Sequence, residues 1–434
     1  MSAEKISVRK LFIFLFAVIL ASPAHALSVI NDTEVEKELY RLITPIATAA
    51  NIPEGRLKIH IVNDDDFNAF VSGGEDVFVY TGLLTRIKNP HALQAVVAHE
   101  LGHMIGGHMA QMSSRMDAEM TRTMIIQALG VGLMVAGGNP SLGAGVLAGA
   151  GGVAQQSMLS FSRDEERMAD DLAVDLLVRA NVNPNGLITV FEQMQDMIGA
   201  AEAKISKNKT NHPMTGERIK NTREKLASVK HNGKYKTYSN DEYELVRAKL
   251  IGYLYPEKRI LDIYPYRNTG NAAIYARAIG NMRGGALDSA RMGAETLIKR
   301  DDKNPYYYEL LGDIEYQLGH YDASVDAYEN ALNLDKNAPQ IQTALALVLS
   351  ERSKPGDNER GIELCKASLL AQPAPLTYWV LAKLYKDGRS YWAFAEFYNM
   401  NGDMKKAKKF AKQAQQKLQK DTPEYIKAGD ILDK

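Results

Sequence analysis

Two glycines 34 residues apart constrain the fold of the second half of this chain. They are Gly285 and Gly319, and Gly402 heads a third copy in which small or aromatic residues recur at the same offsets. This is the period of tetratricopeptide repeats, helix pairs that bury their apolar faces only by stacking on neighbouring pairs. We therefore predict an α-helical solenoid over residues 271–420, with three regular repeats and one irregular one, and a C-terminal tail over 421–434. The recurring positions are Ala290, Ser324 and Ala407, and Ala294, Tyr328 and Ala411.

Length and charge bound the remaining possibilities. The chain has 434 residues, enough for two or three domains. Its 52 basic residues equal its 52 acidic residues, so nothing indicates binding to nucleic acid. With one cysteine, Cys365, the chain can form no internal disulfide.

The first 26 residues read as an export signal. Lysine and arginine precede an apolar run of eleven residues, and the sequence Ala24-His25-Ala26 then supplies a cleavage site. Eleven apolar residues fall short of the about 20 that span a bilayer as a helix. We predict a cleaved signal peptide over residues 1–26 and export of the mature chain; the rival interpretation is an uncleaved transmembrane anchor.

Residues 27–230 begin with mixed signals and continue as helix. Helical spacing covers 34–50, alternation predicts strands over 56–64 and 76–84, and helix-forming sequence begins after Pro90. Residues 160–180 again have helical spacing. We predict an α+β domain here, joined to the repeats by a connecting segment over 231–270.

The stretch His99-Glu100-Leu101-Gly102-His103 is an HExxH motif. Histidines four apart lie on one face of a helix, so both imidazoles can bind one metal ion, while Glu100 can contact a metal-bound water. The flanks of this helix are apolar, and burying three such groups requires a strong partner. The motif therefore predicts a metal site that needs a third ligand.

The third ligand is expected downstream rather than at His108, which lies about 180° round the helix from His99 and is assigned a surface or supporting position. Glu165 and Glu166 both extend the apolar stripe of helix 160–180, and periodicity alone does not choose between them. Glu166 has Asp170 one turn on, where a carboxylate can hydrogen-bond a ligating histidine. On this ground we favour Glu166.

Four motifs in order carry a family resemblance: "NAFVSGGEDVFVYTGLL", "HELGH", "SRDEERMAD" and "NHPMTGERI". They resemble the gluzincin peptidases that include the HtpX heat-shock protease and the CAAX prenyl endopeptidase. With the export signal and the repeats, the chain is similar to the periplasmic β-barrel assembly-enhancing proteases. The resemblance implies a mainly α protein in which an α+β zincin-type metallopeptidase domain precedes the tetratricopeptide solenoid.

The resemblance also implies roles for single residues. His99, His103 and Glu166 would bind one zinc ion, Glu100 would be the general base, and Asp170 would support a ligand. His212, followed by Pro213, would stabilise the oxyanion or gate the site, with Arg218 supporting it; the alternative for His212 is a helix cap. An edge strand would pair with extended substrate, and its expected residues are Val77, Phe78, Val79, Tyr80 and Thr81.

The apolar, glycine-rich residues 124–154 form two halves that are each too short to span a membrane. We expect a helical hairpin packed on its own domain, with peripheral membrane contact as the alternative. The expected partners are protein substrates, by resemblance outer-membrane proteins and their assembly machinery, bound through the repeats. The expected function is therefore zinc-dependent cleavage of misfolded or misassembled proteins, with a chaperone or scaffold bearing a mostly latent metal site as the rival.

Overall fold

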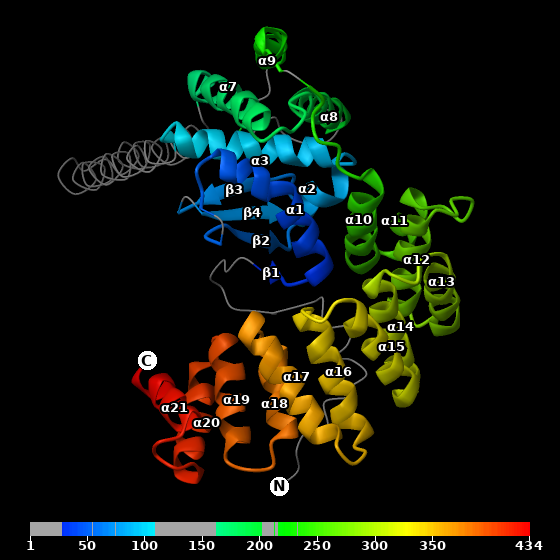
Figure 1. The fold of residues 1–434 in the computed structure, drawn as a ribbon, viewed down its shortest axis with the longest axis vertical. Helices are drawn as coiled ribbons and strands as arrows, with labels where there is room; N and C mark the ends of the chain where they lie inside the picture. The colour runs from blue at the N-terminus through cyan, green and yellow to red at the C-terminus, as the bar shows by residue number, and fades with distance from the viewer. Residues whose placement is uncertain are drawn as a thin grey trace, which may run out of the picture. The chain divides into compact units, whose positions relative to one another are not determined.

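The computed structural model describes residues 28–108 except 54 and 74, residues 162–201, residue 212, and residues 216–434 except 232. The predicted signal peptide, the apolar segment 124–154 and Pro213 lie outside these residues. Within them, helices far outweigh one small sheet (Figure 1). The prediction of a mainly α protein is confirmed.

The chain divides into two compact units. Residues 38–243 form the first, which we call the sheet unit; residues 28–37 and 244–434 form the second, which we call the repeat unit. Helix α1 (Thr33–Ala49) belongs to the repeat unit through Lys37 and to the sheet unit from Glu38 onward. One helix is thus shared by the two units.

The strands of the sheet unit are β2 (Lys58–Val62), β3 (Ala69–Ser72) and β4 (Asp76–Tyr80). Strand β4 pairs in parallel with β2 and in antiparallel with β3. The prediction that Val77–Thr81 form a substrate-pairing edge strand is therefore wrong, because β4 has neighbours on both sides and Thr81 begins helix α2 (Thr81–Arg86). Strand β3 flanks β4 on the side opposite β2.

Helix α3 (Pro90–Ile105) carries the HExxH motif through the middle of the sheet unit. It begins with Pro90, and the side chain of Asn89 accepts a hydrogen bond from the backbone N–H of His91. The helix packs on β3 on one side and on α7 (Arg163–Arg179) and α8 (Gly186–Ala201) on the other (Figure 1). Since it is covered on several sides, its apolar residues run round the helix instead of forming one stripe.

Helices α3 and α7 approach each other closely at Gly102. A side-chain carbon at this glycine would lie 2.6 Å from the backbone oxygen of Ala169, too close for any real contact. The absence of a side chain at Gly102 therefore lets the two helix backbones meet, within one turn of His99 and His103 on α3 and of Glu166 and Asp170 on α7.

The repeat unit begins with the short strand β1 (Val29–Ile30) and the first turn of α1, and continues from α10 as successive helices. From α11 to α21, each helix packs on the next. Residues 231–270, expected as a connecting segment, contain two of these helices. The helices are α10 (Asn240–Leu254), α11 (Glu257–Ile263), α12 (Asn271–Arg283), α13 (Leu287–Arg300), α14 (Pro305–Leu318), α15 (Tyr321–Leu334), α16 (Pro339–Arg352), α17 (Asp357–Ala371), α18 (Pro375–Leu384), α19 (Arg389–Met400), α20 (Met404–Lys417) and α21 (Pro423–Asp433).

The recurring glycines of the repeats occupy the turns between paired helices. Gly285, Gly319 and Gly402 have φ angles of 82°, 81° and 76°. This left-handed conformation ends a helix at little cost only when the residue lacks a side chain. Small residues expected in the helix interfaces, such as Ala290 and Ser324, are fully buried. The helical solenoid is confirmed.

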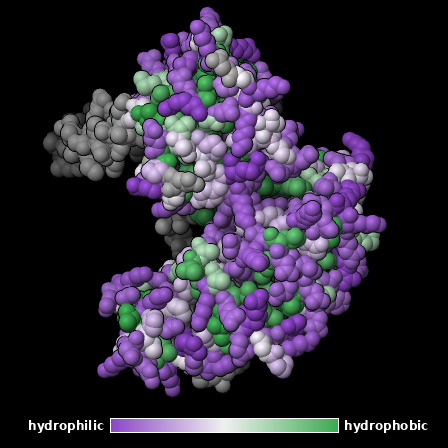
Figure 2. All heavy atoms as spheres, in the orientation of Figure 1, coloured by the Kyte–Doolittle hydropathy of each residue, from purple (hydrophilic) through white to green (hydrophobic). Residues whose placement is uncertain are grey.

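None of the helices in the described part of the chain combines the length and apolarity that a membrane crossing requires. On the face shown in Figure 2, apolar residues are scattered among hydrophilic ones, the usual pattern of a protein surface. Cys365 is buried, and burial raises the pKa of its thiol to about 12, so it is an unreactive core residue as expected.

The contact at Gly102 predicts the effect of a single methyl group. Gly102→Ala should force α3 and α7 apart and lower the free energy of unfolding by about 1–3 kcal/mol, the usual cost of overpacking. Chemical denaturation followed by circular dichroism measures this loss. Gly216→Ala, where nothing lies within 4 Å of the added carbon, is the control; equal stability of the two variants would contradict the packing argument.

Candidate metal centre

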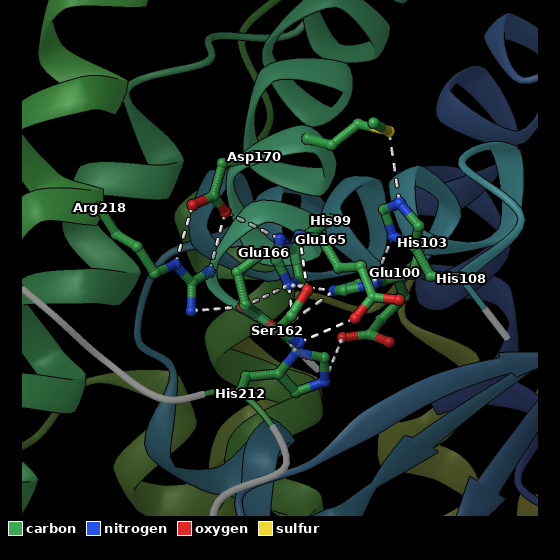
Figure 3. A network of polar contacts seen from close by, with 11 residues as sticks. His99, Glu100, His103, His108, Ser162, Glu165, Glu166, Asp170, His212 and Arg218 are labelled. Carbon is green, nitrogen blue, oxygen red and sulfur yellow. Dashed lines mark hydrogen bonds and ion pairs between the residues drawn. The ribbon is translucent and has the colours of Figure 1, made fainter. Parts of the chain in front are cut away.

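Four side chains bring possible metal-binding atoms together in the sheet unit. They are His99 and His103 from α3, Glu166 from α7, and His212, and one donor atom from each lies within 4.8 Å of all the others. His99, His103 and Glu166 are buried, and the side chain of His212 is 18% exposed. Figure 3 shows these side chains converging from separate parts of the chain.

The distances between the donor atoms fit a tetrahedral metal site. The Nε2 atoms of His99 and His103 are 3.1 Å apart. Glu166 Oε2 lies 3.6 Å from His99 Nε2, and Glu166 Oε1 lies 3.4 Å from His103 Nε2. Ligands about 2.0–2.1 Å from a tetrahedral zinc ion are separated by about 3.3 Å. The three predicted ligands therefore lie near this spacing, with one oxygen of Glu166 toward each histidine.

The two imidazoles of α3 are held so that Nε2 can bind a metal. Asp170 Oδ1 lies 2.9 Å from Nδ1 of His99, and this carboxylate fixes the proton on Nδ1. Burial lowers the pKa of His103 to about 4, so its ring is neutral. The Nδ1 atom of His103 lies 3.1 Å from Nδ1 of His108. The other ring nitrogen of His108, Nε2, lies 3.3 Å from the sulfur of Met168.

His108 is thus a buried residue behind His103, not a ligand. When His103 donates from Nδ1, His108 accepts, and the lone pair on His103 Nε2 is directed at the other donors. This matches the supporting position that the sequence predicts. No sequence pattern predicts Met168 as the neighbour of His108.

The structure separates Glu166 from Glu165. Glu165 accepts a hydrogen bond from the backbone N–H of Ser162 at 2.8 Å, and the hydroxyl of Ser162 accepts one from the backbone N–H of Glu165. This capping box begins α7 and uses the carboxylate of Glu165. Glu166, one residue later, faces the histidines and is 1% exposed.

Arg218 from α9 (Gly216–Ser228) ties the acidic residues together. Its Nε and Nη2 atoms donate to the two oxygens of Asp170 at 2.9 and 2.8 Å, and Nη1 lies 2.6 Å from Glu166 Oε2. Burial favours the protonated form of both carboxyls, but these hydrogen bonds and those from the histidines lower the pKa of Asp170 and Glu166. Both stay charged in a buried site.

Glu100 lies beside the donor cluster and is buried. Burial raises the pKa of its carboxyl, and its Oε1 atom lies 3.4 Å from Nε2 of His212. The other ring nitrogen of His212, Nδ1, is 2.8 Å from Glu166 Oε1 and 3.3 Å from His99 Nε2. Burial lowers the pKa of His212, but the carboxylates of Glu100 and Glu166 outweigh it and raise the pKa overall.

An apolar pocket opens beside Glu100 and His212, and sequence reasoning did not find it. Its walls come from β3 and the residues before it, from α2, from α3 and from α8, so no sequence motif marks it. The one sequence signal for this pocket is the helical spacing of apolar residues in α8, four of which line it. The lining residues are Phe67, Asn68, Ala69, Leu83, Val96, His99, Glu100, Leu187, Val190, Phe191, Met194, His212 and Arg218.

The contacts of Arg218 predict its contribution to metal binding. Arg218→Met removes the partner that orients Asp170 and so loosens His99; we expect about 10–100-fold weaker binding of Zn²⁺, measured by competition with a chromogenic chelator. Arg223→Met is the matched control on the same helix, because Arg223 forms only an exposed pair with Glu192 at 3.3 Å. Equal affinities of the two variants would remove Arg218 from the site.

Comparison with known proteins agrees with this arrangement. Residues 33–226 match the model of peptidase family M48, and residues 312–351 match a TPR repeat model. The β-barrel assembly-enhancing protease of Escherichia coli K12 is 25% identical over 75% of this chain and 67% of its own length. That of Yersinia pestis is 23% identical over 81% of this chain and 72% of its own. The mitochondrial metalloendopeptidase OMA1 of Schizosaccharomyces pombe is 29% identical over 43% and 51%.

The metallopeptidase family model covers the described HExxH helix, Glu166 and His212, and the repeat model falls within the solenoid. The protein is a metalloendopeptidase that is similar to peptidase family M48 over residues 33–226, and tetratricopeptide repeats follow this part of the chain.

Proposed function

We propose that the protein is a periplasmic zinc endopeptidase that removes misfolded or misassembled proteins, outer-membrane proteins among them. The observation that carries the metal assignment is the spacing of His99, His103 and Glu166. Two imidazole nitrogens, one carboxylate and no thiol form a donor set that suits zinc. One zinc ion per chain is the expected content. The relatives named for β-barrel assembly support the class of client.

The reaction we propose uses the residues around this cluster. A bound zinc ion would lower the pKa of water toward about 7 and polarise the peptide carbonyl. Glu100 accepts the proton of the attacking water and then donates it to the leaving amine; its raised pKa suits a group that must do both. Asp170 and Arg218 hold His99 and Glu166 in place throughout.

Substrate is proposed to bind as an extended strand alongside β3. Strand β4, which the sequence predicts for this role, is already paired on both sides. Phe67, Asn68 and Ala69 line the pocket that also contains Glu100, so a peptide paired with this strand would pass the general base. The apolar wall formed by Val96, Leu187 and Val190 favours a large apolar side chain next to the cleaved bond. Such residues are exposed in unfolded chains and buried in folded ones.

His212 is proposed as the gate of the site. In the described arrangement its ring nitrogen lies among the donors, so a bound metal ion would have four protein ligands. Four protein ligands are typical of a structural zinc site, whereas a catalytic site keeps one position for water. His212 must therefore withdraw before cleavage. This observation also supports the rival function, a polypeptide-binding chaperone or scaffold whose metal site is mostly latent.

Glu100→Gln tests the peptidase assignment. The variant should bind one equivalent of zinc and cleave an unfolded protein at least about 100-fold more slowly, because the general base is lost. Metal content and product peptides measured by mass spectrometry check both expectations. Glu192→Gln, an exposed change on α8, is the control; zinc binding without cleavage by the unchanged protein would favour the chaperone.

His212→Ala tests the gate. Removing the fourth donor should raise the cleavage rate by about tenfold if the open form is populated at about a tenth. Zinc binding should persist, because three ligands remain. His231→Ala, which removes an imidazole stacked on Tyr235 outside the cluster, is the control. A lower turnover number with unchanged zinc affinity would instead assign His212 to the reaction itself.

A further inference from the structure

The start of helix α1 makes a set of buried contacts with helices of the repeat unit that lie far along the chain. Glu34 and Tyr275 are 241 residues apart in sequence, yet the hydroxyl of Tyr275 donates a hydrogen bond of 2.8 Å to Glu34. Asp32 and Glu34 are 7% and 6% exposed. Carboxylates are rarely this buried unless charged or polar groups pair with them.

Lys249 of α10 is the cation at the centre of these contacts. It is 3% exposed, and its ammonium lies 2.9 Å from Asp32, 3.2 Å from Glu34 and 3.0 Å from Glu309 of α14. The ring of Tyr306 lies beneath it, 5.0 Å away. Burial lowers the pKa of Lys249, but the carboxylates outweigh it and raise the pKa well above its usual value, so the lysine stays charged.

The residues that follow contact successive repeats. Thr33 hydrogen-bonds Gln340 of α16, and Lys37 pairs with Asp335. Glu36 accepts a hydrogen bond of 3.2 Å from Gln372, which precedes α18. Tyr275 and Glu309 occupy equivalent positions of neighbouring repeats, as do Tyr306 and Gln340. A short segment that contacts the first helix of one repeat after another is held as a solenoid holds a peptide ligand.

Carboxylates outnumber the ammonium group at this contact. Without the segment, Lys249 has Glu309 as a partner at 3.0 Å and Asp313 nearby. The segment adds two further carboxylates around the single lysine, and burial raises the pKa of Glu34 and of Asp313 to about 7. Like charges without full compensation weaken a buried ionic cluster. The lysine thus has a partner in either state.

We propose that residues 32–37 are a peptide ligand built into the chain, which is held through Lys249 on the surface formed by α10, α12, α14 and α16 and can leave that surface. This surface accordingly recognises an acidic segment at the start of a helix. Asp32 fits this description, because its side chain also accepts the N–H of Val35 and so caps α1.

The same helix continues into the sheet unit. There the carbonyl of Leu42 accepts a hydrogen bond of 2.9 Å from the side chain of Gln94, which is fully buried on the metal-binding helix α3. Helix α1 therefore contacts Lys249 through its first turn and Gln94 of α3 through its middle.

The test uses the full chain and a synthetic peptide copying residues 28–40. In the chain variant Asp32→Asn/Glu34→Gln, the built-in ligand loses its charges while Lys249 keeps Glu309. The labelled peptide should bind this variant at least about tenfold more tightly than the unchanged chain, as measured by fluorescence anisotropy. Adding Lys249→Met to the variant should abolish that binding. A peptide carrying the same two substitutions is the matched ligand and should bind neither chain.

Hydrogen exchange provides a second measurement that does not depend on the peptide. The amides of residues 33–38 should exchange about tenfold faster in Asp32→Asn/Glu34→Gln than in the control Glu257→Gln/Asp262→Asn, which removes equal charge from the exposed face of α11. Amides of α14 and α16 should stay protected, showing that the solenoid remains folded. Equal peptide binding by both chains, no binding by either, or unchanged exchange at residues 33–38 would each overturn the proposal.

Discussion

The close crossing of α3 and α7 is the constraint on which the site depends. Gly102 allows the backbone of α7 to approach to within a distance that no side chain would permit. Because Glu166 lies on the first turn of α7, this crossing brings its carboxylate within 3.4 Å of His103. A shift of one ångström would exceed the tolerance of a metal site.

Burial of charged and polar side chains at this crossing is unfavourable, and the surrounding residues compensate for it. Two histidines, two glutamates and an aspartate in a dry interior would be strongly unfavourable if left unpaired. Arg218 meets this cost with three short contacts to Asp170 and Glu166, and His108 meets it for His103. The lone pairs that remain belong to the converging donor atoms of His99, His103, Glu166 and His212. A bound cation would compensate for their mutual repulsion.

In the repeat unit, Lys249 compensates for buried acidic side chains as Arg218 does at the metal centre. There a single buried ammonium faces several carboxylates from distant parts of the chain, so charge is again what holds separate elements at one point. The two clusters differ in their balance. The metal centre surrounds its acidic residues with donors, whereas the lysine has more acidic neighbours than it can neutralise, which is why we regard that contact as reversible.

The sequence alone determined what depends on local spacing. Wherever an HExxH motif lies on a helix, its two histidines, here His99 and His103, share one face. The 34-residue period with glycines at the turns specifies paired helices. Asp170 could be expected to support a ligating histidine because it lies one turn from Glu166, although only the structure identifies that histidine as His99. Each of these inferences needs only the geometry of a helix or a turn.

Tertiary structure decided the rest, because the deciding contacts join residues that no local spacing relates. Glu165 and Glu166 share a stripe, and only the capping box with Ser162 shows which one is free to face the metal site. The order of strands made β3, not β4, the strand beside the pocket. The position of His212 among the donors, and of residues 32–37 beside Lys249, depends on pairings across 46 and more than 200 residues, which packing fixes and periodicity cannot.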